Sequence, residues 1–298
     1  MAVPDLAAVM ADLHGAAERI WMECEADWPG LTVEVLPEVD STNTRLVQQG
    51  RQGSCHPSVL TAVTQTAGRG RMGRSWQARP GATLTCSTGL VIDLDRIPGG
   101  GTALSLAVGL AVAEALDAGL QGEQTDANAS SAQPVGLKWP NDLWLGERKL
   151  GGILIEACPA PGLSSSERWV VIGLGLNVLP PPPMPEAACL PQAAQRALTV
   201  GTVWAWVVPA LLGRVRQFVD TGFAPWQAAY ARRDVLQGRT VQLTTGLGAD
   251  QGAPQPALAT GLCQGVDSDG ALLVHTPTGL QRWQTGEVSV RPAPVPIH

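Results

Sequence analysis

The chain has 298 residues, a length that predicts about two domains at roughly 150 residues each, with a sizeable buried core. Its 45% hydrophobic and 15% charged residues are typical of a globular protein, and its formal net charge of −6 argues against a protein that coats nucleic acid through a basic face. The longest apolar run, residues 103–113, is shorter than the ~18–20 residues that cross a bilayer, and the acidic N-terminus lacks the basic region of a secretory signal. These features predict a cytoplasmic protein without nucleic-acid or membrane partners.

The first half of the chain predicts alternating helices and strands. A helix is expected within residues 1–30, followed by strands at 31–39, 59–65 and 83–92. Residues 102–119 predict a helix that is apolar on nearly every side and therefore buried. The polar segment 121–134, rich in Gln, Ser, Ala and Asn, is typical of a surface insertion.

The second half predicts the rest of the sheet and then a change of texture. Strands are expected at 135–139, 149–157 and 169–178, and helices at 186–198, 201–221 and 226–233. After residue 238 the pattern becomes short strands, with hairpin turns at 267–270 and 277–279. The expected organisation is a catalytic domain over 1–236, with its N-terminal helix in 1–30, and a small β-barrel over 237–298.

The cysteines and histidines suggest no site of their own. The six cysteines include no C-x-x-C pair, and the four histidines do not cluster with one another or with cysteine. The sequence therefore predicts no protein-held metal ion and no dense disulfide framework. A Ser-His-Asp or Cys-His mechanism has no visible base.

The basic residues are unusually biased towards arginine. Of 20 basic residues, 18 are arginine and only two, Lys138 and Lys149, are lysine. Both lie in one segment, KWPNDLWLGERK. Chance placement is one interpretation; the other is that these positions need a compact ammonium group, which a planar guanidinium does not replace.

The densest chemical signal is residues 65–76, QTAGRGRMGRSW, where three arginines alternate with glycines. Glycine lets the backbone approach an anion and arginine supplies bidentate donors, so this loop predicts binding of a polyanion. The spacing Gly68-x-Gly70-x-x-Gly73 also matches a dinucleotide fingerprint, but no helix is predicted after it, as that motif requires. An RGG-type RNA segment would lie in a repeated, disordered tract.

Four further segments carry polar residues beside predicted strands. They are DSTN at 40–43, KWPNDL at 138–143, KLGGILIE at 149–156 and GLGLN at 173–177. Taken alone, the first also reads as a helix N-cap and the second as an ordinary turn.

Together these segments resemble the biotin protein ligase family, in which KLGGIL at 149–154 and GLGLNV at 173–178 complete the pattern. Their order and spacing fit, and GVDSDGALLV at 265–274 with GEVSVR at 286–291 resembles the family's small terminal domain. The resemblance covers about residues 33–291. Only about 30 residues precede the first strand, too few for a winged helix-turn-helix domain, so we expect the monofunctional form that lacks a DNA-binding domain.

The resemblance implies an α+β fold. A mixed β-sheet catalytic domain flanked by helices, of the class II aminoacyl-tRNA synthetase and biotin ligase type, would precede an SH3-like β-barrel. The implied activity is that of an ATP-dependent ligase, which forms biotinyl-5′-AMP from biotin and MgATP. It then transfers biotin to a lysine of a biotin carboxyl carrier protein, the acetyl-CoA carboxylase subunit, or of another biotin-dependent carboxylase.

The resemblance also implies residue roles. Biotin would be bound by Ser41, Thr42, Asn43, Gln65, Arg69, Gly70, Arg71 and Lys138. The nucleotide would be bound by Arg71, Trp76, Lys138, Asn141 and Asn177. Catalysis would rest on Lys138, Arg69 and Arg71, with Asp142 as the candidate general base and Arg291 as a weaker candidate from the terminal domain.

Two alternatives stay open at this point. A lipoate- or octanoate-type protein ligase would share the sheet and the adenylation chemistry. A non-catalytic module would bind biotin or nucleotide without labelling a carrier. The oligomeric state is also open, a homodimer included.

Overall fold

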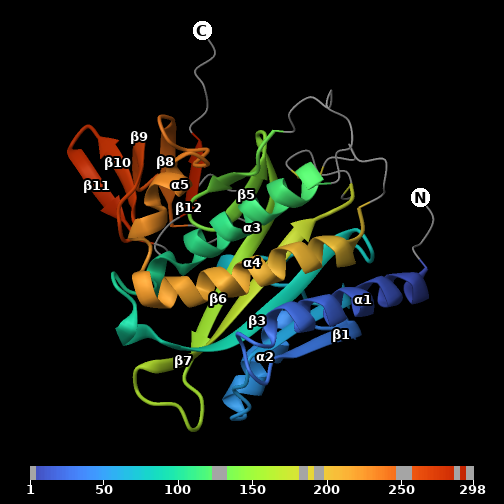
Figure 1. Ribbon diagram of the computed structural model, residues 1–298. Coiled ribbons are helices and arrows are strands. Elements are labelled where there is room, and N and C mark those ends of the chain that lie inside the picture. Colours follow the sequence, from blue (N-terminus) through green and yellow to red (C-terminus); the bar gives the residue numbers. More distant parts are fainter. Residues whose placement is uncertain are drawn as a thin grey trace.

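The computed structural model describes residues 5–122, 133–180, 187–190, 198–245, 257–284 and 289–292. Within them the chain builds two sheets, one of seven strands and one of five, with helices packed against the larger sheet (Figure 1). This agrees with the predicted α+β class.

The seven-stranded sheet is mixed. Its order is β1-β2-β3-β7-β6-β5-β4, in which β1 and β2 are parallel and the other neighbours antiparallel. The strands are β1 (Thr32–Val39), β2 (Ser58–Gln65), β3 (Thr83–Asp93), β4 (Gly136–Lys138), β5 (Asp142–Leu145), β6 (Arg148–Cys158) and β7 (Glu167–Asn177). The predicted strands are confirmed, while β5 was not predicted.

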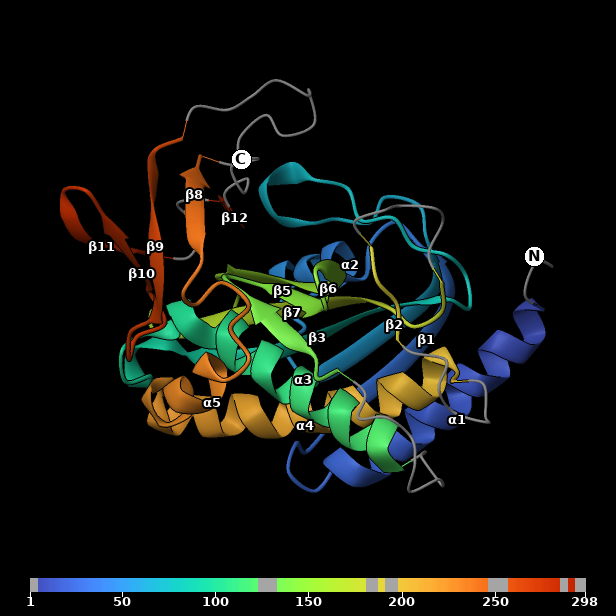
Figure 2. The same cartoon turned by 90° about the horizontal axis from the view of Figure 1, so that it is seen from above.

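Three helices cover one face of this sheet and a fourth lies on the other (Figures 1 and 2). The first three are α1 (Leu6–Cys24), α3 (Leu104–Gly122) and α4 (Val200–Thr221); α2 (Thr42–Arg51) packs on the opposite face. The main core joins the three helices to the apolar side of the sheet, and a smaller cluster, with Leu46 and Trp169, lies under α2. The face that carries α2 is therefore the more open one.

Helix α3 with the turn before it, Gly101–Gly122, is long and apolar enough to cross a membrane by length and composition alone. Two thirds of it is buried inside the protein, against the sheet and α4. Its all-round apolar surface is thus that of a core helix, as the sequence predicts.

The second sheet has the antiparallel order β11-β10-β9-β8-β12. Its strands are β8 (Thr240–Thr244), β9 (Ala259–Val266), β10 (Leu272–Thr276), β11 (Gly279–Trp283) and β12 (Ser289–Pro292), and both predicted hairpins form. It follows α5 (Gln227–Ala231) and docks on the larger unit, where the Trp139 Nε1–H donates to the Gly270 carbonyl oxygen at 3.1 Å. A boundary at residue 237 stays a prediction.

The helix predicted at residues 186–198 is wrong over the part of it that the structure describes. Residues 187–190, within the helix expected at 186–198, are not helical. Ala187 forms a bridge with Lys149, and the Ala188 N–H donates to the Lys149 carbonyl oxygen at 2.7 Å. The remaining turns of that prediction, and most of the 121–134 insertion, lie outside the described residues.

Asp234 is a partly buried acid where the chain passes from α5 to the second sheet. Its Oδ1 accepts from the Leu236 N–H at 2.9 Å, whereas its Oδ2 is buried without a hydrogen-bond partner in the described part of the chain. Burial raises the pKa of this carboxyl to about 6.

Replacing Asp234 by asparagine is expected to raise the free energy of unfolding by roughly 2 kcal/mol at about pH 8 and to change it little near pH 4. The folded protein holds this proton more tightly than the unfolded chain does. The protonated Asp234 carboxyl therefore makes its full contribution to the free energy of unfolding below pH ~4, and this contribution is lost as the pH rises through ~6. Denaturant unfolding of the wild type and the variant at both pH values measures the effect. An equal difference in the free energy of unfolding at the two pH values would contradict the prediction.

Candidate functional site

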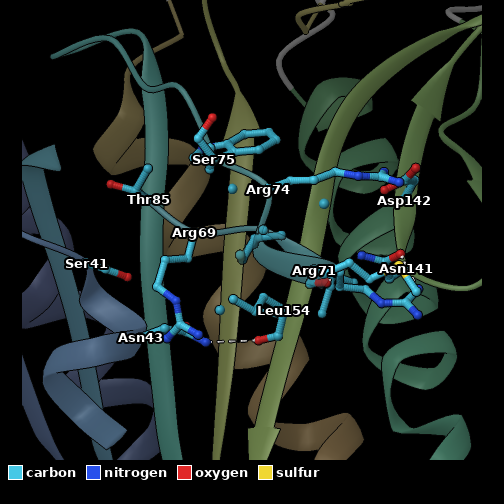
Figure 3. A pocket seen from close by; sticks show the side chains of 18 of the residues that line it. Ser41, Asn43, Arg69, Arg71, Arg74, Ser75, Thr85, Asn141, Asp142 and Leu154 are labelled. Atoms are coloured by element: carbon cyan, nitrogen blue, oxygen red, sulfur yellow. Dashed lines mark hydrogen bonds between the residues drawn. The ribbon is translucent and has the colours of Figure 1, made fainter. Parts of the chain in front are cut away.

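A single pocket on the α2 face gathers almost every predicted site residue (Figure 3). It lies between the 65–76 loop, the first turn of α2, the β4–β5 turn and strand β12. Of the predicted residues, those that line it are Ser41, Thr42, Asn43, Gln65, Arg69, Gly70, Arg71, Trp76, Lys138, Asn141 and Asp142.

The floor of the pocket is made of small residues on three neighbouring strands. Gly175 of β7 lies opposite Thr85 of β3 and Gly152 of β6, and Gly173 lies one row further along β7. A Cβ at Gly173 would overlap the Asn43 Oδ1, and one at Gly175 would overlap the Trp76 ring. Glycine at these two positions therefore lets side chains from α2 and the loop rest on the sheet backbone.

One end of the pocket is polar and has no unpaired charge, since its one charged lining residue, Arg69, is paired with Glu156. Ser41 is the N-cap of α2, which turns Thr42 and Asn43 towards the sheet, and all three are buried. The Gln65 Oε1 accepts from the Thr42 N–H at 2.8 Å, and the Ser87 hydroxyl lies 2.7 Å from the Thr42 Oγ1. Hydroxyl and amide groups are thus held ready for a neutral polar ligand group.

The arginine loop folds back on itself as a narrow hairpin. The Trp76 N–H donates to the Gly68 carbonyl oxygen at 2.9 Å, and the Gly70 N–H donates to the Arg74 carbonyl oxygen at 2.7 Å. At the tip Met72 has φ +57°, a left-handed conformation that is uncommon for a residue with a side chain. The hairpin holds its three arginines over the sheet.

These arginines point in two directions (Figure 3). Arg69 points towards Asn43, where it makes a two-pronged ion pair with Glu156 at 2.9 and 3.1 Å. Arg71 and Arg74 point towards the β4–β5 turn. The Arg71 Nη1 donates to the Asn141 Oδ1 at 3.0 Å, and burial lowers the pKa of the Arg71 guanidinium.

Both lysines of the chain meet at Asp142. The Lys149 Nζ lies 2.6 Å from one carboxylate oxygen and the Lys138 Nζ lies 3.6 Å from the other. Lys138 is the more buried, with 13% of its side chain exposed against 38% for Lys149, and burial lowers the pKa of its ammonium. Lys149 therefore presents the more accessible ammonium group, 5.8 Å from the centre of the Trp76 ring.

Asp142 is poorly suited to accept a proton. Burial alone would raise the pKa of its carboxyl, but the neighbouring Lys149 and Lys138 ammonium groups outweigh that effect and hold the pKa below its usual value. The carboxylate is therefore ionised near neutral pH and shared between two cations. Its evident role in this structure is to fix the lysines.

Two predicted residues lie elsewhere. The Asn177 Nδ2 donates to the Ala188 carbonyl oxygen at 3.0 Å, so this amide holds the 187–190 segment and does not line the pocket. In β12 it is Val290 that lines the pocket, and the next residue, Arg291, is exposed. Side chains alternate along a strand, which explains why neighbours differ.

Sequence reasoning left out some residues of the site. Lys149 and Arg74 line the pocket, and Glu156 and Ser87 bind residues that do. The signals for Lys149 and Arg74 were present, since Lys149 is one of only two lysines and Arg74 is the third arginine of the loop predicted to bind a polyanion, but neither was assigned a role. Glu156 ends the 149–156 segment, but no role was predicted for it, and Ser87 had no signal, because both act through partners that are distant in the sequence.

The site combines a neutral polar end with a cationic end. Asp142 is the acidic residue among those that line it, and within the described ranges no group of three or more His, Cys, Asp or Glu gathers to hold a metal ion. Such a pocket fits a ligand with a polar uncharged head and a strongly anionic tail. Fixed cations near one point also favour a reaction in which negative charge accumulates there.

Comparisons with known proteins agree with this geometry. The Biotin/lipoate A/B protein ligase family model matches residues 35–177, and the Biotin protein ligase C terminal domain model matches residues 254–291. The bifunctional ligase/repressor BirA of Escherichia coli (strain K12) is 31% identical over 268 residues, which cover 89% of this chain and 75% of that protein.

Two further proteins extend the likeness. The biotin--[acetyl-CoA-carboxylase] ligase of Mycobacterium tuberculosis is 31% identical over 245 residues, covering 80% of this chain and 82% of that one. The structure of the biotin protein ligase from Aquifex aeolicus in complex with biotin and ATP superposes with a TM-score of 0.65 at 26% identity, covering 88% of this chain and 99% of that one. With the five motifs gathered at one pocket, these matches show that the chain belongs to the biotin protein ligase family.

Proposed function

We propose that this protein is an ATP-dependent biotin protein ligase. It activates biotin as biotinyl-5′-AMP with release of pyrophosphate, and then transfers the biotinyl group to a lysine of a biotin carboxyl carrier protein. The observation that carries the proposal is the convergence of Arg71, Arg74, Lys138 and Lys149 on one pocket whose other end is neutral and polar. The names of the relatives and the biotin and ATP complex of the Aquifex aeolicus protein support it.

The neutral end of the pocket is proposed to bind the ureido group of biotin. This group has one carbonyl acceptor and two N–H donors, which suit the hydroxyl and amide groups of Ser41, Thr42, Asn43 and Gln65. Because Gly173 and Gly175 let Asn43 and Trp76 lie close against the sheet, the bicyclic ring would pack over these side chains. Gly70 and the backbone on either side of it would close over the valeryl chain.

The cationic end is proposed to bind the biotin carboxylate and the α-phosphate of ATP. Attack of a carboxylate on a phosphate brings two anions together, so fixed positive charge lowers the barrier most where the two meet. Lys149 is the accessible ammonium there, Lys138 supports it through Asp142, and Arg71 covers the anhydride. Trp76 offers a ring for stacking of the nucleotide base.

Mg²⁺ is proposed to enter with the nucleotide. Magnesium is commonly held by substrate phosphates together with one or two carboxylates, and Asp142 is already paired with both lysines. When present, the ion would neutralise the phosphates and assist departure of pyrophosphate. The residues of this chain then act on the carboxylate and the α-phosphate.

The acceptor is proposed to be the carrier domain of acetyl-CoA carboxylase or of another biotin-dependent carboxylase. Its lysine must lose a proton before it attacks the anhydride, and at neutral pH this costs about 4–5 kcal/mol. Asp142 is a weak base for that step because its pKa is lowered. The second sheet, which contributes Val290 to the pocket, is well placed to meet the carrier.

The experiment that tests the function incubates the protein with biotin, MgATP and a purified carrier domain, followed by streptavidin detection. Labelling that depends on ATP and on the acceptor lysine is expected. Pyrophosphate exchange driven by biotin and not by lipoate or octanoate separates the proposal from the related ligases. Binding of biotin without exchange or labelling would instead indicate a non-catalytic module and would contradict the proposal.

Replacing Gly173 by alanine is expected to raise the KM for biotin by about tenfold and to leave the KM for ATP within about twofold. The added methyl group would overlap the Asn43 Oδ1 and push that amide off the floor at the neutral end. Steady-state kinetics with each substrate varied gives the two constants.

Gly213→Ala is the matched control, because its Cβ meets nothing within 4 Å in α4. It should leave both constants unchanged. Equal increases in the two KM values of Gly173→Ala would indicate a general distortion and would count against the placement of the biotin ring.

A further inference from the structure

Glu156 lies on β6, outside the pocket, and contacts two residues that line it. Its carboxylate accepts from both terminal nitrogens of Arg69, at 2.9 and 3.1 Å, and its Oε2 also accepts from the Asn43 Nδ2 at 3.1 Å. About a quarter of its side chain is exposed, 26%, against 46% for Arg69. One carboxylate thus joins the arginine loop to the first turn of α2.

The contact with Asn43 fixes the direction of that amide. The Asn43 Nδ2 donates to Glu156 and to the Leu154 carbonyl oxygen at 3.2 Å, which are both acceptors. The Asn43 Oδ1 consequently faces the Ser87 hydroxyl at 2.6 Å and rests over Gly173. Turning the amide over would place its N–H groups against that hydroxyl and its oxygen against two acceptors, so the carboxylate selects one orientation.

The contact with Arg69 removes the positive charge of this arginine from the ligand. A two-pronged pair between guanidinium and carboxylate is among the stronger polar contacts in proteins. Here it engages both terminal nitrogens of Arg69. The bond spans the loop and β6, which lie 87 positions apart in the chain. It therefore holds the start of the hairpin against the sheet, whereas Arg71 and Arg74 stay directed at the cationic end.

We propose that Glu156 is a positioning residue of the ligase: it orients Asn43 for the biotin head and latches the arginine loop through Arg69, so that Arg69 acts through Glu156 and not on the phosphate. The proposal rests on the proposed function of this pocket. It predicts that loss of the carboxylate weakens biotin binding and retention of the adenylate while the chemical step stays nearly intact.

Glu156→Gln tests the first part. The KM for biotin is expected to rise about tenfold, and the adenylate to leave the enzyme about tenfold faster, with the single-turnover rate of adenylate formation within about twofold. Glu147→Gln is the matched control, because it breaks another Arg–Glu pair, with Arg239 at 3.0 Å, outside the pocket. Unchanged KM and unchanged escape in Glu156→Gln would overturn the proposal. If that variant does not fold, Arg69→Gln must show the faster escape.

The charge-swapped protein, Arg69→Glu with Glu156→Arg, tests the second part. If Arg69 acts through Glu156, the swap restores adenylate retention relative to either single change. It does not restore the KM for biotin, because an arginine at 156 offers Asn43 no acceptor. A swap that fails to restore retention would show that Arg69 acts directly on the ligand. Labelling of the carrier by the wild-type protein tests the ligase function independently. If the wild type labels the carrier, failure of the variants to behave as expected contradicts only the proposal about Glu156.

Discussion

Lys149→Ala is expected to lower the rate of biotinyl-adenylate formation by about 10²–10³-fold, the usual cost of removing one fixed donor to a developing charge. Lys149 presents its ammonium to the pocket beside Trp76, while Lys138 is largely buried and paired. Lys138→Ala should also slow the step, because Asp142 then loses one of its two cations. Rapid-quench measurement with labelled ATP, without a carrier, reports adenylate formation directly.

Lys149→Arg separates charge from shape. The Lys149 Nζ lies 2.6 Å from Asp142 and would be 3.3 Å from a Cβ at Gly152, and a planar guanidinium does not place a compact charge at that point. We expect Lys149→Arg to be nearly as slow as Lys149→Ala. An arginine variant with close to normal rates would show that charge alone suffices, and a Lys149→Ala variant with normal rates would remove this lysine from the mechanism.

Arg71→Ala is expected to release the adenylate about 10–100-fold faster, the effect of losing a hydrogen bond to a charged group. Arg71 reaches from the loop to Asn141 at 3.0 Å and so closes the pocket between the hairpin and the β4–β5 turn. Without it the anhydride escapes and acylates exposed lysines of other proteins. Streptavidin detection of an added bystander protein, such as serum albumin, measures that escape.

The control for Arg71→Ala is labelling of the bystander by the wild-type protein at equal adenylate production. Arg168→Ala offers a matched change, because this arginine lies at the start of β7, away from the pocket lining, and donates to the nearby Ser165 and Glu167 carbonyl oxygens. The Arg168→Ala variant should label the carrier and leave the bystander protein unlabelled. If Arg71→Ala were as selective as the wild type, the loop arginine would not retain the intermediate.

Much of the sheet could be predicted because its central strands β2, β3 and β7 are buried along most of their length. β3 and β7 are almost continuously apolar or small, and α3 is apolar around its circumference, so pattern and burial agree. Residues 187–190 behaved differently. Alanine-rich sequence favours a helix, but free backbone groups of Lys149 and Asn177 at the end of the sheet bind this segment instead. Local propensity gives way to tertiary hydrogen bonds there.

The site was predictable where its residues are rare or clustered. The glycine-arginine loop and the KWPNDL turn indicate a cationic pocket, and the scarcity of lysine singles out Lys149 as well as Lys138. Pairing between distant residues was not predictable. Nothing in the sequence indicates that Arg69 binds Glu156, or that Asp142 is neutralised by two lysines and is therefore a weak base.

The central claim is that this pocket holds a biotinyl adenylate between its polar end and its cations. The most direct measurement mixes the wild-type protein with biotin and α-labelled MgATP, removes free nucleotide and then adds the carrier domain. The account predicts about one equivalent of bound label per protein, recovered as biotinyl-5′-AMP, which the carrier consumes as it becomes biotinylated. Absence of bound adenylate, or bound adenylate that the carrier does not consume, would contradict it.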